Sequence, residues 1–466
     1  MRPFPGGTIM KRFVIALAAI AVTSATALAN IYETNDLQRA NLKTVSTWTA
    51  EQQKAHGKNQ AFFVRRGLVA DKATDTVQIL VESTEVQANS TIEFPIIGEL
   101  SDRDYEALFR TFAKPGDIAE ALEFLGLPRG RNVDSKALNF WPRGERVAIT
   151  VAPYGAKTAP LPIQAYLYDR EVKGLPTWKN FVYCGSPDDP VAKDGSRLAN
   201  NMAPNSVLST YNEMQTVLDV PDLSNQSDVY ERFVKNDAQK IPHFALFTAT
   251  LKPVRRADKQ PSIQDYQLKI LPGKGALAFD LSHAGKTERF TDAKALFVKL
   301  HDAVTGGFDP FVSVAFDDGL TLADARQMAL ALSQIDGANG VKIAPPAKGS
   351  VYYKSFLPAE RWRISKNRTS QPWEIHFAPA TNAAPTVRLV QTLEDWSDPN
   401  SLDPILTPKS YDVPVKADEI AARIKKIGAG LPVQLVFAPD NAPLSLFMPT
   451  VRALLTDHPV VYLFNE

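Results

Sequence analysis

The C-terminal part of the chain contains one order of elements twice, and this repeat restricts the fold more than any other feature. The segments DAKALFVKLHDAV, FVSVAF, LTLADARQMALALSQI and GVKIAPP have the patterns of helix, strand, helix and strand. KADEIAARIKKIG, PVQLVFAPD, PLSLFMPTVRALL and PVVYLFNE repeat that order at the end of the chain. Near-continuous apolar runs such as FVSVAF and PVQLVF suit strands that are covered on both faces. The sequence therefore predicts tandem α/β modules, residues 262–380 and 381–466, in which these two runs are equivalent interior strands.

The N-terminal part is rich in alternating, strand-like text, such as DTVQILVEST, ERVAITVAPYG and HFALFTATLKPV. Among these strands, PGDIAEALEFLG predicts a short helix with Pro115 in its first turn, Asp117 near its positive end and Gly126 as its stop. We expect the apolar face of this helix to be scaffold, buried in the core through Ile118, Leu122 and Leu125. The preceding YEALFRT fits either a helix or a short strand.

These patterns predict a mixture of α+β and α/β structure. Residues 30–252 form a β-rich α+β domain with one packed helix and a polar lead-in, and the two small sheet-and-helix modules follow it. The polar, proline-flanked segment KPVRRADKQP is the expected linker.

The first 29 residues have the pattern of a signal peptide. A basic leader precedes the apolar run Phe13–Ala21, and Ala27–Ala29 forms a small-residue cleavage site. Either Met1 or Met10 can be the start, because MKRFVIALAAIAV is a complete leader by itself. A retained membrane anchor is disfavoured, because the apolar run is shorter than the roughly 20 residues that a spanning helix needs. The sequence therefore predicts a periplasmic or secreted protein.

Composition excludes several classes of function. The leader carries three basic residues and no acid, so its removal lowers the formal charge of +1 by three and leaves no basic field for nucleic acid. No segment after residue 29 approaches transmembrane length. The single cysteine, Cys184, excludes an internal disulfide and a multi-cysteine zinc site, and the six histidines have no metal-ligand spacing. We predict no metal and no cofactor.

Few residues suggest catalysis. Cys184 in FVYCGS sits at a strand end, where it is either a catalytic thiol or a small buried apolar residue. Asp188 lies in a turn after this strand, where aspartate also serves backbone hydrogen bonds. Together with Glu106, these two residues are the catalytic candidates.

Residues 101–221 resemble the YdjY-type domain of exported bacterial proteins. The matching text is YEALFRTFAKPGDIAEALEFLGLPRG, GERVAITV, WKNFVYCGS and LANNMAPNSVLSTYNEMQTVLDVP. Where that family often has a His-Glu pair, this chain has Tyr105 and Glu106. The family has no settled activity, so the resemblance implies a domain and an exported setting but no reaction.

The helix–strand–helix–strand order of the C-terminal modules is similar to the periplasmic domain of ExbD/TolR proteins, which are partners in envelope energy transduction. That resemblance implies small periplasmic modules that contact other envelope components. Neither module here follows a membrane helix of its own.

Aromatic and basic residues gather between the modules, in SVYYKSFLPAERWRISKNRTSQPWEIHF. Such side chains dominate binding hot spots because each combines a large contact area with a directional polar group. Alternatively, the aromatic rings fill the seam between the modules while the basic groups reach solvent. The binding candidates are Tyr352, Tyr353, Trp362, Arg363 and Trp373.

Two hypotheses of function follow. The first is a non-enzymatic exported envelope protein that contacts a protein or a cell-wall polymer. The second is a hydrolase or other enzyme on the YdjY-like domain, which requires Glu106, Cys184 and Asp188 to converge in one pocket.

Overall fold

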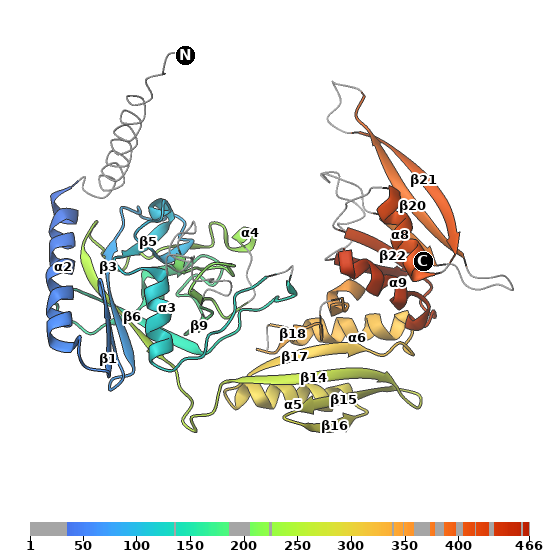
Figure 1. The fold of residues 1–466 in the computed structure, drawn as a ribbon, viewed down its shortest axis with the longest axis horizontal. Coiled ribbons are helices and arrows are strands. Elements are labelled where there is room, and N and C mark those ends of the chain that lie inside the picture. The colour runs from blue at the N-terminus through green and yellow to red at the C-terminus, as the bar shows by residue number, and fades with distance from the viewer. Residues whose placement is uncertain are drawn as a thin grey trace, which may run out of the picture. The chain divides into compact units, whose positions relative to one another are not determined.

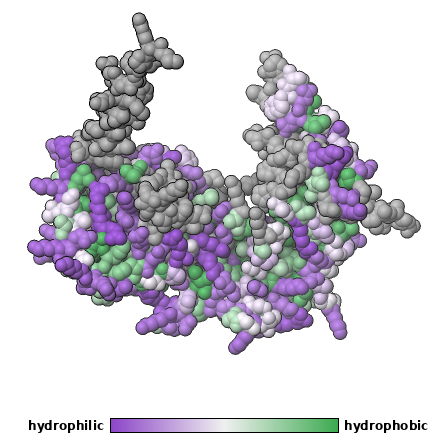
Figure 2. Space-filling view, viewed as in Figure 1, coloured by the Kyte–Doolittle hydropathy of each residue, from purple (hydrophilic) through white to green (hydrophobic). Residues whose placement is uncertain are grey.

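The structure, a computed structural model, describes residues 35–134, 137–185, 206–222, 226–337, 340–347, 349–357, 373–377, 386–397, 404–414, 416–427, 433–457 and 460–465. The predicted signal peptide, residues 1–29, lies outside the described residues. The chain has a mixed α+β fold with several sheets (Figure 1). No helix in the described part is long and apolar enough to cross a membrane. On the face drawn in Figure 2, hydrophilic residues cover much of the surface and hydrophobic residues are interspersed among them.

The chain divides into two compact units. Unit 1 comprises residues 1–131 and 146–254, and unit 2 comprises residues 132–145 and 255–466. The segment 132–145 therefore belongs to unit 2, although the sequence pattern had assigned it to the N-terminal domain of residues 30–252. Its side chains explain the difference, because Phe140, Trp141 and Arg143 contact residues of unit 2.

Unit 1 is built on an 11-stranded sheet in the order β1-β2-β3-β13-β6-β9-β11-β10-β4-β5, with β7 beside β6. A further pairing of β3 with β5 closes the sheet on itself. A small sheet pairs β8 with β12. The strands are β1 (Phe62–Arg65), β2 (Leu68–Asp71), β3 (Thr76–Ser83), β4 (Phe94–Ile97), β5 (Ala107–Thr111), β6 (Arg146–Pro153), β7 (Leu161–Pro162), β8 (Leu167–Asp169), β9 (Phe181–Tyr183), β10 (Ser206–Leu208), β11 (Leu218–Asp219), β12 (Phe233–Lys235) and β13 (Leu246–Pro253).

Two helices cover opposite faces of β3. Alternate residues of a strand point to opposite faces, so Ile79 and Val81 join the main core while Leu80 joins a smaller cluster with Val45 of α2 (Asp36–His56). The predicted scaffold helix is α3 (Pro115–Phe124), with proline at its start and Gly126 at a φ of 87° after its end. Its predicted core face is confirmed, because three side chains are buried: Ile118, Leu122 and Leu125. The lead-in helix α2 also packs on the sheet, so unit 1 has more than the one packed helix that was expected. In the ambiguous YEALFRT, Ala107–Thr111 form β5, and the two residues before them belong to a short 3-10 helix. A single helical turn, α4 (Gln226–Val229), precedes β12.

Unit 2 contains two sheets with the same strand order. They run β16-β15-β14-β17-β18 and β21-β20-β19-β22-β23. In each sheet the central strand pairs antiparallel with the second strand and parallel with the fourth. FVSVAF and PVQLVF provide β17 and β22, the fourth strand of each sheet. The elements are β14 (Ile263–Pro272), β15 (Leu277–His283), β16 (Lys286–Phe290), α5 (Ala293–Thr305), β17 (Asp309–Phe316), α6 (Leu322–Ile335), β18 (Lys342–Ala344), β19 (Trp373–Phe377), β20 (Thr386–Asp395), β21 (Ile405–Pro414), α8 (Ala417–Ile427), β22 (Val433–Ala438), α9 (Leu444–Asp457) and β23 (Val460–Asn465).

The boundary between these modules differs from the predicted one at residue 380. Strand β19 pairs with β20 and with β22, so it is the first strand of the second sheet. In the sequence, the alanine- and proline-rich segment APATNAAP separates WEIHF from the strand-like TVRLVQTL, and a boundary at residue 380 leaves WEIHF with the first module. The backbone hydrogen bonds of WEIHF join it to the second module instead.

The two modules join through equivalent loops. Leu322 N donates to Ala442 O (2.9 Å), and Leu444 N donates to Leu320 O (2.7 Å). Arg452 of α9 pairs with Asp318, which precedes α6, and Arg326 of α6 pairs with Asp440, which precedes α9. This reciprocal pattern is what a local two-fold relation between two copies of one module produces.

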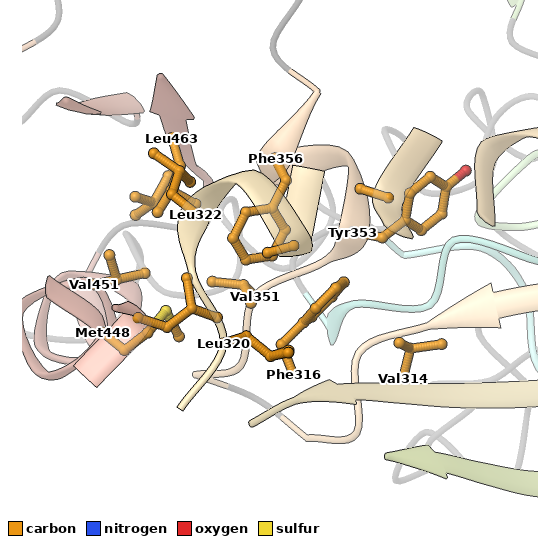
Figure 3. Close-up of a cluster of buried hydrophobic side chains, with 14 of the residues drawn as sticks. Val314, Phe316, Leu320, Leu322, Val351, Tyr353, Phe356, Met448, Val451 and Leu463 are labelled. Carbon is orange, nitrogen blue, oxygen red and sulfur yellow. The ribbon is translucent and has the colours of Figure 1, made fainter. Parts of the chain in front are cut away.

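A single hydrophobic core spans both modules. Figure 3 shows Phe316, Leu320 and Leu322 of the first module packed near Met448, Val451 and Leu463 of the second. Since apolar burial contributes roughly 25 cal/mol per Å², a shared core makes the folding of each module depend on the other.

Candidate functional site

The residues predicted as catalytic do not form one site in the described structure. Glu106 ends the short helix η1 (Asp104–Glu106), directly before β5. Cys184 follows β9 and is fully buried, with its thiol 3.6 Å from the carbonyl oxygen of Val182. The closed sheet places β9 and β5 four strand-to-strand steps apart in either direction. Asp188 lies outside the described residues. Glu106 and Cys184 therefore do not meet in one pocket, which is the arrangement that the hydrolase hypothesis requires.

Glu106 belongs instead to a group of carboxyl side chains in unit 1. Glu93 N donates to the carbonyl oxygen of Glu106 (3.0 Å), which sets the two residues side by side. Burial raises the pKa of the Glu106 carboxyl, and the negative charge of Glu93 raises it further. Arg103 Nη1 lies 3.2 Å from Glu106 Oε1 and opposes this shift. We call Glu93, Glu106, Glu213 and Asp219 the carboxylate cluster.

Glu213 and Asp219 are its most perturbed members. Burial raises the pKa of Glu213 to about 7, and the charge of Glu93 acts in the same direction. Asp219 is fully buried, and desolvation raises its pKa well above the usual range although Asn212 Nδ2 donates to it at 3.1 Å. A carboxyl group that titrates near neutral pH can act as a general acid or base. Within the described ranges, no group of three or more His, Cys, Asp or Glu side chains is placed to hold a metal ion.

The predicted binding residues of unit 2 are largely internal. Tyr352 and Tyr353 each donate a hydrogen bond of 2.8 Å to Asp336 Oδ2. Tyr353 is 2% exposed, and Trp373 is fully buried in the shared core. Trp362 and Arg363 lie outside the described residues. Since β19 carries Trp373 into the sheet interior, the aromatic side chains that the structure describes here fill the core rather than a surface.

Asp336 is the centre of this arrangement. Its Oδ1 accepts from Trp141 Nε1 (3.1 Å) and from the backbone N–H of Ile343 (3.0 Å), so four donors meet one carboxylate. Gly337 follows with a φ of 79°, and a Cβ there would lie 2.7 Å from the Trp141 ring. Only glycine satisfies both the left-handed backbone and the close approach of the indole.

An exposed apolar surface lies elsewhere in the second module. Strand β19 pairs with β20 only as far as Val390, and beyond it β20 pairs with β21 alone among the described residues. We call this overhang, residues 391–396 and 405–409, the ribbon. Figure 1 shows β20 and β21 reaching past α8 and α9. Four large apolar residues of the ribbon are about half exposed: Leu393 (42%), Trp396 (57%), Ile405 (62%) and Leu406 (49%).

Sequence reasoning missed most of these residues. Glu93 had a weak signal, as a lone acid inside the apolar run STIEFPIIG. Trp396 also had a sequence signal, because in LEDWSDP a large aromatic residue lies beside turn residues, where side chains are seldom buried. Glu213 and Asp336 had none, because their perturbation depends on strands and helices that are distant in sequence.

Comparison with known proteins adds little to this picture. No protein-family model matches the chain, and no curated protein matches it. Among solved structures, an uncharacterised protein from Pseudomonas aeruginosa with similarity to the peptidase YeaZ is one match. It has 10% identity and a TM-score of 0.13, and the match covers 42% of this chain and 83% of that one.

Proposed function

We propose that the chain is an exported, non-enzymatic protein of the bacterial envelope that contacts a protein or a cell-wall polymer through unit 2. The observation that carries this proposal is the ribbon, where β20 pairs with β21 alone among the described residues and four apolar side chains are about half exposed. Neighbouring exposed apolar side chains mark interaction surfaces, so those of the ribbon favour a partner.

The chemistry of the remaining candidates supports binding over catalysis. The Cys184 thiol is buried, and the carboxylate of Asp336 is engaged by four donors. The edge strand β21 carries Pro408, which lacks the N–H that strand addition needs. We therefore expect the ribbon to bind through its side chains. The basic leader, apolar run and Ala27–Ala29 cleavage site support export.

The ribbon is tested by changing one of its exposed side chains. Ile405→Asp should weaken binding of the purified mature chain to an isolated envelope fraction at least tenfold, because a central apolar contact is worth about 2 kcal/mol or more. Leu330→Asp is the matched control, since Leu330 is 55% exposed on α6 outside the ribbon. Equal weakening by both variants, or by neither, would contradict a role for the ribbon.

A second candidate function is acid–base catalysis at the carboxylate cluster. The pKa of about 7 for Glu213 favours it, because such a group can exchange protons at neutral pH. In this candidate, Glu213 takes the catalytic place of Cys184, and Glu93 connects it to Glu106, because the charge of Glu93 raises the pKa of both carboxyls. A hydrolytic activity of the pure protein that Glu213→Gln abolishes would support it.

A further inference from the structure

The first module of unit 2 holds a cleft at one edge of its sheet. The cleft has a volume of about 580 Å³ and lies between the β14–β15 turn, the start of α5 and the first turns of α6. Strands β14 and β17 are parallel and both end at this edge. Ligand pockets usually occupy about 300–1,000 Å³, and in open α/β sheets ligands bind where the parallel strands end. The cleft thus has the size and the position of a binding site.

The floor of the cleft is apolar. Phe279 of β15 and Met328 of α6 line it and belong to the core, with exposures of 2% and 3%. Leu277 and Ala331 complete this floor. A ligand seated here removes apolar surface from water, so methylene groups are favoured as the part that reaches the floor.

Two carboxylates, Asp292 and Asp324, also line the cleft, and the lining contains no lysine or arginine. Asp292 Oδ1 accepts from Lys294 N (3.0 Å) at the start of α5, and Asp324 Oδ2 accepts from Thr321 Oγ1 (2.8 Å) at the start of α6. Within the described ranges, the other oxygen of each carboxylate has no hydrogen-bond partner. The helix dipoles offset roughly half a charge each, so the lining residues keep a net negative charge, with Lys274 adjacent in the β14–β15 turn but outside the lining.

We propose that the cleft binds a primary ammonium group carried on an aliphatic chain, as in a lysine side chain. The methylene groups lie on Phe279 and Met328, and the ammonium group donates to Asp292 and Asp324. Charge-assisted hydrogen bonds of this kind are roughly twice as strong as neutral ones. Anionic ligands are disfavoured, because the same two carboxylates repel them. This inference concerns a surface other than the ribbon, so either one can fail while the other stands.

Three probes of equal chain length test the chemistry on the whole mature chain: n-hexylammonium, 1-hexanol and hexanoate. Calorimetry or NMR shifts should show hexylammonium binding with a Kd on the order of 1 mM, as expected for a ligand of this size. Hexanol should bind at least fivefold more weakly, and hexanoate more weakly still. The peptide Gly-Gly-Lys-Gly-Gly tests whether the ammonium group comes from a lysine side chain or from a free amine. Tighter binding of the peptide than of hexylammonium indicates a lysine side chain, and weaker binding indicates a free amine.

Variants fix the location. Asp292→Asn keeps the helix start, because asparagine caps as well as aspartate, and it should weaken hexylammonium binding about fivefold. Asp302→Asn, an exposed position near the other end of α5, should leave binding unchanged. Gln327→Trp places a large ring in the cleft from an exposed helix position and should abolish binding. Equal affinity for hexylammonium and hexanol, or binding that persists in Gln327→Trp, would overturn the proposal.

Discussion

Asp336→Ala should lower the free energy of unfolding of unit 2 by about 3–5 kcal/mol. The change removes the common acceptor of the Trp141 indole, the Ile343 amide and two tyrosine hydroxyls. Each buried donor that loses its partner costs about 1–3 kcal/mol, and Tyr352, which is only half-buried, recovers part of this from water. Urea unfolding, followed by tryptophan fluorescence, measures the loss.

Two milder variants separate the loss of hydrogen bonds to the carboxylate from the loss of side-chain volume at position 336. Tyr353→Phe removes one donor and should cost about 1 kcal/mol, because Oδ2 still accepts from Tyr352. Asp336→Asn keeps the volume and one acceptor oxygen, so it should fall between Tyr353→Phe and Asp336→Ala. A loss below 1 kcal/mol in Asp336→Ala would show that the four hydrogen bonds to this carboxylate contribute little to the stability of unit 2.

Glu213→Gln should stabilise unit 1 at pH 8 and have little effect near pH 4. Burial raises the pKa of Glu213 to about 7, above the roughly 4.3 of an unfolded glutamate. A raised pKa gives stability that is complete below the unfolded value and is lost as the pH rises through the folded value. Glutamine is never ionised, so the variant should gain on the order of 3 kcal/mol at pH 8.

The gain is measured as the difference in unfolding free energy between variant and wild type from pH 4 to pH 8. It should grow through the window between about 4.3 and about 7. Glu85→Gln, at an exposed position of unit 1, is the control and should give no such window. If the difference in unfolding free energy between Glu213→Gln and wild type did not change with pH, burial would not raise the pKa of this carboxyl, and the prediction would be contradicted.

Much of the fold could be predicted from the sequence, because the spacing of apolar residues and the Pro and Gly residues that start or end an element are local signals. α3 shows this, since Pro115 at its start, Gly126 after its end and the Ile118–Leu122 spacing define it without any distant contact. The repeated order of helices and strands in the two modules could also be predicted, because FVSVAF and PVQLVF occupy matching positions between helices, whereas the order of strands within each sheet could not. The placement of Trp373 was not, because hydrogen bonds to β20 and β22 decide which sheet a short strand joins.

The candidate sites were harder to predict, because they depend on contacts between distant residues. Tyr352 and Tyr353 have the composition of a binding surface, and the structure turns both hydroxyls toward Asp336. Glu106 was named for its place in a resembling motif, whereas the shift at Glu213 arises from burial among strands that close on themselves. Trp396 lies beyond Val390, the last residue of β20 that pairs with a described residue of β19, and that pairing between distant segments cannot be read from the local sequence.

The proposal that the ribbon contacts an envelope partner is tested most directly by photo-crosslinking in the producing cells. Benzoylphenylalanine replaces Trp396, which is 57% exposed on the ribbon, or Tyr230, which is 64% exposed in unit 1. We predict adducts from position 396, recovered in the envelope fraction, and none of comparable yield from position 230. Equal yields from both positions, or no adduct from position 396, would contradict a function based on contact through the ribbon.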